Sequence, residues 1–369
     1  MSGEYQYYPG IARSRIQDLR EAYPGLKIKY SLKANSFPRF LDGFLPTVDS
    51  VDVSSERELS VAKSLYPGIP VSISGPGKDV DLLDYCAYRK ALVNIECLDE
   101  ARELSSIAET RHTDIEVAIR VNPNFKVRGA GFTMGGKASP FGIDLQQVYQ
   151  VVKFIKESPL RFRGFQVYAG TQILDSELVG LVQRYSAELL FELQSQYGGD
   201  HLSFGGGLGV PYHGEEPVDL QIASSWYRDL YDKHPEHTDF LSMEVGRYIV
   251  APAGEYRVTV LYKKESYGKN YLVVDGGIHE NFVISGGFGQ LIPRNFPVWN
   301  WKPKLCTRDT EVYDIVGKLC TPQDVLARGV VLPVTEPGDT LVFDMCGAYC
   351  ASASMKDFLS HEHATEGVW

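Results

Sequence analysis

The chain has 369 residues, of which 44% are hydrophobic and 23% charged, and its formal net charge at pH 7 is -10. This length suits two domains, or one barrel of about 250 residues with a smaller companion. The acidic balance argues against nucleic acid or an anionic membrane as a general partner. No apolar run reaches the roughly 18 residues of a membrane span and no apolar leader is present, so we expect no membrane segment.

The six cysteines are too few and too scattered for a disulfide scaffold, which indicates reduced thiols in a cytoplasmic protein. Cys346 and Cys350 are spaced like half a zinc site, but no second pair follows at zinc spacing, and core or loop cysteines are the simpler interpretation. His361 and His363 flank a glutamate near the end of the chain. We expect a solvated tail there rather than a metal site.

Residues 27–34 have the composition of a buried strand, and two-residue alternation places Ser31 and Lys33 on one face. Two interpretations of Lys33 are open at this point. Its ammonium can reach solvent at the strand end, or it can be desolvated enough to condense with an aldehyde. The residues at the ends of the later strands decide between them.

A short apolar strand, a turn and an amphipathic helix recur along the first two thirds of the chain, with helices that include 56–65, 145–157 and 176–197. Such units predict a parallel (β/α)8 barrel over residues 9–252, with its chemistry at the carboxyl ends of the strands. The predicted strands lie near 27–34, 50–55, 70–76, 91–96, 116–122, 164–170, 201–207 and 239–246.

After Pro252 the pattern changes to alternating strands with glycine and proline turns and no helical periodicity. This predicts a smaller, mostly antiparallel β domain, a sandwich or barrel, over residues 253–369, which the strand at 1–8 joins. Residues 285–309 read as a long irregular loop, and long loops in compact domains are usually functional or mobile.

Polar and glycine residues gather at the predicted strand ends. Gly205-Gly-Gly207 follows a strand, where its backbone amides can form a phosphate cup with Thr171 and Arg247; a tight turn is the alternative. Glu244 at the next strand end can keep a pyridine nitrogen protonated, or it can simply pair with Arg247.

Five motifs occur together in order: Tyr30-Ser-Leu-Lys-Ala-Asn35, Gly205-Gly-Gly, Glu244-Val-Gly-Arg247, Gly317-Lys-Leu-Cys-Thr-Pro-Gln-Asp324 and Gly347-Ala-Tyr349. Across nearly its whole length the chain resembles the alanine-racemase-fold, pyridoxal-phosphate-dependent decarboxylases, which include the ornithine, arginine and diaminopimelate enzymes. The resemblance implies a carboxy-lyase with pyridoxal 5'-phosphate as its cofactor.

The resemblance also implies roles by position. Lys33 matches the Schiff-base lysine, and Glu244 matches the partner of the pyridine nitrogen. The other positions that match cofactor contacts or lie close to them are Asp52, Glu58, Arg120, Tyr168, Thr171, Gly205, Gly206, Gly207, Arg247 and Tyr349.

Cys320 matches a cysteine that the second subunit presents and that reprotonates the substrate carbon after CO2 leaves. Asp275, Thr321 and Asp324 match positions near the substrate. The family builds its two active sites across a head-to-tail dimer, so we expect a homodimer with shared sites.

Two departures from the family pattern bear on the substrate. Tyr168 stands where a histidine usually stacks on the ring, and Thr321 stands where an acidic residue usually follows the cysteine. The missing acid argues against free ornithine, lysine and arginine. These features, with Met134-Gly-Gly and Phe141-Gly-Ile-Asp144, are most similar to the decarboxylases that act on an amino acid tethered to an acyl carrier protein in natural-product biosynthesis.

A carrier protein is acidic, so its docking would need a basic patch. Candidates are Lys126, Arg128 and Lys137, or Lys263 and Lys264, with a solvated face as the alternative.

Other functions stay open. The substrate can instead be a free amino acid or siderophore precursor, as for a diaminopimelate-like enzyme, and the same barrel supports racemases and non-catalytic pyridoxal-phosphate-binding proteins. Glu244 and Cys320 favour decarboxylation over racemisation. The β domain argues against the small binding proteins.

Overall fold

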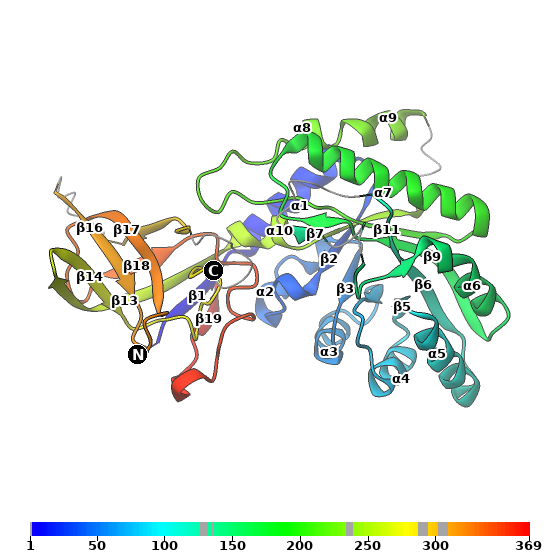
Figure 1. Ribbon diagram of the computed structural model, residues 1–369, viewed down its shortest axis with the longest axis horizontal. Helices are drawn as coiled ribbons and strands as arrows, with labels where there is room; N and C mark the ends of the chain where they lie inside the picture. The colour runs from blue at the N-terminus through cyan, green and yellow to red at the C-terminus, as the bar shows by residue number, and fades with distance from the viewer. Residues whose placement is uncertain are drawn as a thin grey trace.

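A computed structural model describes residues 2–125, 132–133, 136, 138–233, 239–286, 294–301 and 309–369 of the chain (Figure 1). It contains a parallel barrel, on the right in Figure 1, and a β domain on the left, with α1 and α10 lying between them. Both chain ends lie in the β domain.

The barrel is closed by hydrogen bonds around its whole circumference. Its strands pair in parallel in the order β2-β3-β4-β5-β6-β9-β11-β12 and then back to β2. Each strand is rich in buried aliphatic residues, as expected where helices cover a parallel sheet. The barrel strands within the described residues are β2 (Lys27–Ser31), β3 (Ser50–Val53), β4 (Val71–Ile73), β5 (Leu92–Ile95), β6 (Ile115–Asn122), β9 (Leu160–Val167), β11 (His201–Gly205) and β12 (Leu241–Val245).

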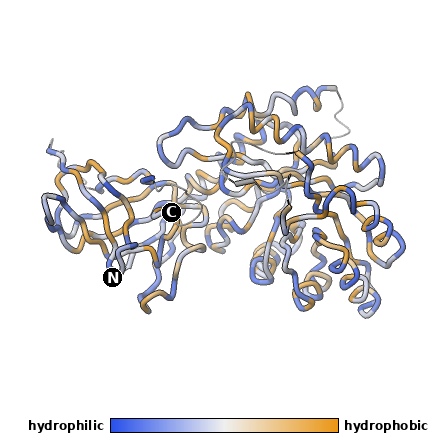
Figure 2. Tube along the Cα trace, viewed as in Figure 1, coloured by the Kyte–Doolittle hydropathy of each residue, from blue (hydrophilic) through white to orange (hydrophobic). Residues whose placement is uncertain are grey.

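The helices around the barrel each bury one face. In α6 the buried residues Val148, Val151, Val152 and Ile155 recur at helical spacing. Figure 2 shows the same pattern as alternating apolar and hydrophilic colours along the helices. The helices are α1 (Pro9–Ala22), α2 (Pro38–Asp42), α3 (Glu56–Leu65), α4 (Val80–Arg89), α5 (Leu98–Arg111), α6 (Leu145–Lys156), α7 (Ser176–Tyr197), α8 (Leu220–Ala223), α9 (Ser225–Lys233) and α10 (Arg247–Val250).

The β domain is one sheet with the strand order β15-β18-β13-β14-β16-β17, and β1 extends it by pairing with β13 and with β19. Most pairs are antiparallel; β14–β16 and β1–β19 are parallel. Its strands are β1 (Glu4–Tyr7), β13 (Gly254–Ser266), β14 (Lys269–Val274), β15 (Val298–Asn300), β16 (Thr310–Val316), β17 (Val325–Pro333), β18 (Thr340–Phe343) and β19 (Thr365–Val368).

The remaining elements are short. They are the strands β7 (Phe132–Thr133), β8 (Ile143–Asp144) and β10 (Gly170–Thr171) and the 3₁₀ turns η1 (Leu32–Ala34), η2 (Leu45–Thr47), η4 (Ala251–Ala253) and η5 (Phe358–Ser360). None of the helices in the described ranges combines the length and apolar composition that a membrane span requires.

The predicted fold class, a (β/α)8 barrel with a smaller β domain, is confirmed, and all the predicted barrel strands are present in order. Two local predictions were wrong. The first strand ends at Ser31, so Lys33 lies in the turn η1 rather than on the strand. The predicted loop at 285–309 contains β15, because residues 298–300 pair with β18.

The end of the chain also differs from the expected solvated tail. β19 pairs in parallel with β1, and the ring of His361 lies 5.4 Å from the ring of buried His279, centroid to centroid. His363 is exposed and contacts Asp357 at 3.5 Å. The described residues contain no group of three or more histidine, cysteine, aspartate or glutamate side chains that could hold a metal ion.

Candidate active site

A pocket lies at the carboxyl-end rim of the barrel, where η1, β9, β11 and β12 end and the β domain approaches. It brings together residues that are far apart in the sequence. Those singled out from the sequence that line it are Lys33, Tyr168, Thr171, Gly207, Glu244, Arg247 and Tyr349.

Lys33 projects into this pocket from η1. Its Nζ lies 5.2 Å from the centroid of the Tyr168 ring. The Lys33 side chain is exposed to solvent in the pocket, but desolvation by the protein around its Nζ lowers its pKa, whereas neighbouring tyrosine oxygens and the carboxylates of Asp52 and Glu244 raise the pKa, and the net direction is upward. The two carboxylates therefore favour the charged ammonium of Lys33 until a ligand changes its surroundings.

Glu244 ends β12 inside the barrel and is only 4% exposed. Ser203 donates to its Oε1 at 2.8 Å, and the amide of Gln166 donates to both carboxylate oxygens at 2.8 and 3.0 Å. These donors come from the neighbouring strands β11 and β9. They fix the carboxylate in one orientation, with its edge available to the pocket.

A second lysine, Lys29, lies buried inside the barrel and forms an ion pair with Glu244. Lys29 is 1% exposed, and its Nζ lies 3.9 Å from Glu244 Oε1 and 3.2 Å from Nε2 of His201. Burial, together with the Lys29 ammonium, lowers the pKa of His201 well below its usual range. Neutral His201 therefore accepts a hydrogen bond from Lys29. Lys29 and Glu244 carry opposite charges, so each reduces the free-energy cost of burying the other inside the barrel.

Asp52 ends β3 beside the same pocket and is 2% exposed. The hydroxyls of Ser72 and Ser74 both donate to its Oδ1 at 2.9 Å. Burial raises the pKa of Asp52 to about 6, with a further contribution from Glu244, although Lys29 and Lys33 act in the opposite direction. Asp52 therefore changes charge near physiological pH.

This shift predicts a pH dependence of stability in the protein without bound ligand. The folded-state pKa of Asp52 lies above its unfolded value of about 3.9, so the folded state binds the proton more tightly. The contribution of Asp52 to the free energy of unfolding therefore falls as pH rises from about 4 to 6, by on the order of 2 kcal/mol, and levels off above that. Asp52→Asn keeps the oxygen that Ser72 and Ser74 contact but removes this decline.

Urea unfolding of both proteins between pH 4 and 7.5 measures the effect. The stability of Asp52→Asn relative to the native protein should rise across the pH range named above. Parallel curves for the two proteins would show that Asp52 does not titrate there.

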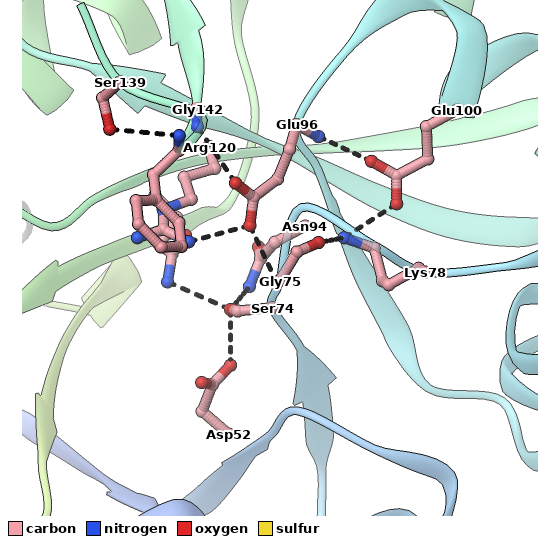
Figure 3. Close-up of polar contacts among 12 residues, drawn as sticks. Asp52, Ser74, Gly75, Lys78, Asn94, Glu96, Glu100, Arg120, Ser139 and Gly142 are labelled. Atoms are coloured by element: carbon pink, nitrogen blue, oxygen red, sulfur yellow. Dashed lines mark hydrogen bonds and ion pairs between the residues drawn. The ribbon is translucent and has the colours of Figure 1, made fainter.

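Arg120 ends β6 and is held by Glu96, as Figure 3 shows. Glu96 Oε1 accepts from Arg120 Nη1 and from the backbone N–H of Gly75, both at 2.8 Å, while its Oε2 accepts from the N–H of Gly142 at 3.0 Å. The Arg120 guanidinium also lies 4.9 Å from the centroid of the Phe141 ring. Arg120 is thus fixed on the rim, although it does not line the Lys33 pocket.

Arg247 lines the pocket with its guanidinium beside two tyrosines. Its Nη1 donates to the hydroxyl of Tyr212 at 3.0 Å, and its guanidinium lies 4.6 Å from the centroid of the Tyr349 ring. Its buried Nε has no hydrogen-bond partner within the described residues. A buried donor without a partner is costly, so it marks a place for an acceptor such as a phosphate oxygen.

The glycine turn lies opposite Arg247 and permits close approach of a ligand. Gly207 has φ of 70°, and a Cβ at Gly205 would lie 2.6 Å from Cδ2 of Tyr168. The absence of a side chain at Gly205 therefore lets the Tyr168 ring lie flat against β11. With Thr171 on β10, these residues suit an anionic group next to a planar ring.

The predicted substrate residues of the β domain do not line this pocket within one chain. Asp275 Oδ1 accepts from the N–H of Thr259 at 2.7 Å, and Asp324 accepts from the N–H groups of Ile278 and Leu319, each at 2.8 Å. Both aspartates are 3% exposed and organise the β domain. Cys320 is exposed, and Thr321 follows it in the same loop between β16 and β17.

The structure describes only some of the basic residues that were predicted to form a carrier-docking patch. Lys126, Arg128, Lys137 and the segment 134–135 lie outside the described residues. Lys263 forms ion pairs with Glu311 at 2.9 Å and Glu336 at 3.3 Å, so its charge is engaged within the β domain.

Sequence reasoning missed Lys29, Gln166, Ser203 and Glu96. The signal was present in part, because Lys29 has the same strand parity as Ser31. Gln166 and Ser203 are likewise buried polar residues, and each has an apolar residue on either side in its strand. Their partners lie on other strands, which no local pattern reveals.

The family model described as "Pyridoxal-dependent decarboxylase, pyridoxal binding domain" matches residues 11–251. That range includes the whole closed barrel.

Curated relatives match over almost the entire chain. The L-glutamyl-(BtrI acyl-carrier protein) decarboxylase of Niallia circulans is 30% identical, over 97% of this chain and 86% of the relative. The 2-((L-alanin-3-ylcarbamoyl)methyl)-2-hydroxybutanedioate decarboxylase of Staphylococcus aureus is 29% identical, over 94% of this chain and 89% of the relative. A diaminopimelate decarboxylase of Campylobacter jejuni is also 29% identical, over 95% and 86% of the two chains.

Solved structures share the fold. Diaminopimelate decarboxylase from Helicobacter pylori complexed with L-lysine superposes with a TM-score of 0.86 at 24% identity, covering 100% of this chain and 92% of the other. Lysine/ornithine decarboxylase from Vibrio vulnificus complexed with cadaverine gives a TM-score of 0.81 at 19% identity, covering 100% and 94%.

Proposed function

The chain belongs to the pyridoxal-dependent decarboxylase family and is a pyridoxal-phosphate-dependent carboxy-lyase, and we propose that its substrate is an α-amino acid extended through its side chain, with an acyl-carrier tether as the leading candidate. The single observation that carries the proposal is the similarity, over 97% of the chain, to a decarboxylase named for a carrier-linked glutamyl substrate. Thr321, in place of the acid that would bind a distal ammonium, is consistent with it.

The pocket fits pyridoxal phosphate at each of its parts. Lys33 would hold it through its amine, Tyr168 would face its ring, and Glu244 would pair with its ring nitrogen. The phosphate would lie against Arg247, whose Nε lacks a protein partner. Thr171, Gly207 and Tyr349 would complete that end.

When bound, this cofactor supplies an electron sink for the bond to the leaving carboxylate. The residues of the chain supply orientation and protons. Gln166 and Ser203 hold the Glu244 carboxylate in one orientation, and Arg247 would hold the phosphate of the cofactor while Lys33 would hold its aldehyde carbon. Lys33 Nζ is placed to exchange a proton with the substrate amine.

The proton that replaces CO2 on the substrate carbon needs a separate donor. Cys320 is exposed and does not line the pocket of its own chain. We propose a homodimer in which Cys320 of the partner subunit completes each site and its thiol delivers this proton.

The cofactor site gives a prediction at Gly205. Gly205→Ala places a methyl group 2.6 Å from the Tyr168 ring and forces the ring away from β11. We expect the dissociation constant for pyridoxal phosphate to rise about tenfold or more, from the 1–3 kcal/mol typical of overpacking. Gly68→Ala is the matched control, because its added methyl has no atom within 4 Å. Equal affinities in the two variants would contradict the placement of Tyr168.

A second candidate is a free substrate of the diaminopimelate type, supported by the C. jejuni relative. A panel of purified substrates scored by CO2 release separates the two. It contains free L-glutamate, L-ornithine, L-lysine and meso-diaminopimelate, and L-glutamate joined through its side-chain carboxyl to a carrier protein. We expect kcat/KM for the tethered substrate to exceed the others by at least about 100-fold. Preference for a free diamine or diaminopimelate would overturn the tethered-substrate proposal.

A further inference from the structure

A second cavity lies next to the Lys33 pocket and shares Tyr349 with it. Its volume is 340 Å³, within the range of pockets that take small molecules. One wall comes from the barrel rim at Ala34 to Pro38 and the start of α3. The other comes from the β domain between Gly347 and Glu366.

The two walls are held together beside Lys33. The N–H of Tyr349 donates to the carbonyl of Ala34 at 2.7 Å, and the Asn35 amide donates to the carbonyl of Gly347 at 2.9 Å. Asn35 is two residues after Lys33. The cavity therefore lies beside the rim segment that carries Lys33, with Tyr349 common to the cavity and the pocket.

Four charged side chains line the cavity. The two carboxylates accept hydrogen bonds from the protein, whereas the two cations do not form hydrogen bonds or ion pairs within the described residues. The carboxylate of Glu58 accepts from the N–H of Ser54 at 2.7 Å, and that of Glu366 accepts from the hydroxyl of Tyr7 at 2.9 Å. Arg57 and Lys356 are exposed and have no hydrogen-bond or ion-pair partner among the described parts of the chain. Two unengaged cations thus stand on opposite walls, in a chain with a net charge of -10.

We propose that this cavity binds the anionic distal part of the substrate, with Arg57 and Lys356 as its cationic contacts. This inference rests on the proposed function and names the chemistry of the substrate extension. The α-carboxylate must stay free to leave, so the extension joins through the side chain. It then runs from Lys33 past Asn35 and Tyr349 towards the two cations.

The anion has two possible sources. A carrier arm provides a phosphate, whereas a free conjugate such as the hydroxybutanedioate compound named for the S. aureus relative provides carboxylates. Both chemistries pair with arginine and lysine. The same cavity could accept either the phosphate or the carboxylates, so the experiment tests each of them separately.

The first arm uses the L-glutamate side-chain thioester of pantetheine 4′-phosphate and the same thioester of pantetheine without phosphate. The second uses 2,3-diaminopropionate acylated on its side-chain amine by a hydroxytricarboxylic acid, and the same compound with those carboxylates amidated. Steady-state CO2 release is measured for the native holoenzyme and for Arg57→Gln, Lys356→Gln and the double variant. Isothermal titration with the decarboxylated amines measures binding without turnover.

We expect the double variant to raise KM and the product dissociation constant at least about tenfold for the anionic member of one pair, with kcat retained. The neutral member should be unaffected. Arg39→Gln on α2 is the matched control, because Arg39 is exposed and does not line the cavity. The pair that responds identifies the source of the anion.

Equal effects of the double variant on anionic and neutral members, or no effect on either, would overturn the cavity proposal. If CO2 is still released from a side-chain-extended substrate in that case, the proposed function stands. Failure to release CO2 from any extended substrate would instead overturn the proposed function, and the titration would still test the cavity.

Discussion

Replacing Lys33 by alanine is expected to lower kcat/KM for decarboxylation by about 10³-fold or more. Lys33 Nζ is the amine that faces Tyr168 and the Arg247 end of the pocket. Its removal takes away both the covalent anchor for the cofactor and the group that exchanges protons beside it. Because Lys33 lies in a short turn at the rim, the barrel should fold without it.

Chemical rescue separates this role from a loss of structure. A small primary amine in solution should restore part of the activity of Lys33→Ala, since it can occupy the space left by the side chain. Lys153→Ala, at an exposed position on α6, is the control and should retain full activity. A Lys33→Ala protein with near-native kcat/KM would contradict the assignment.

Glu244→Gln is expected to lower kcat by about 10²-fold or more while leaving KM nearly unchanged. Glutamine has nearly the same shape but no negative charge to pair with a protonated ring nitrogen. The change also leaves the Lys29 ammonium buried 3.9 Å from a neutral group. Removal of one partner of a buried pair typically costs on the order of 3 kcal/mol of unfolding free energy.

The double variant Lys29→Met/Glu244→Gln distinguishes these two effects. Removal of both charges should recover much of the stability lost in Glu244→Gln, measured by urea unfolding of the cofactor-free protein. It should not recover kcat, because the charge at the ring nitrogen is still missing. A Glu244→Gln enzyme within about threefold of native kcat would contradict the role proposed for Glu244.

The fold was predictable because its signals are local. Buried parallel strands give short apolar runs, and helices such as Ser176–Tyr197 begin and end at their predicted residues. The turn η1 was not predictable in this way, since Leu32, Lys33 and Ala34 continue the mixture of apolar and lysine residues found in β2. The pairing of β15 with β18 also depends on a partner more than 40 residues away.

The site residues that belong to a sequence motif were predictable. The residues that hold them through hydrogen bonds were not. Lys33, Glu244 and Arg247 stand in motifs, and the structure brings them to one pocket. The donors that hold Glu244 and the acceptor that holds Arg120, Glu96, come from other parts of the barrel. Each is an ordinary polar residue in its own segment, so only the closed barrel shows what it contacts.

The β-domain positions depend on assembly. Asp275 and Asp324 bond to backbone groups of their own domain, and Cys320 lies in an exposed loop. Sequence similarity relates these positions to an active site, but one chain does not place them there. In the proposed dimer, the second copy of the chain would bring its Cys320 loop to the active site.

Borohydride reduction of the purified holoenzyme, followed by peptide mapping, tests the central claim most directly. We expect a visible absorbance band that disappears on reduction and a single reduced pyridoxal phosphate adduct on Lys33. An adduct on another lysine, such as Lys29, or a protein that takes up no pyridoxal phosphate when it is supplied, would contradict it.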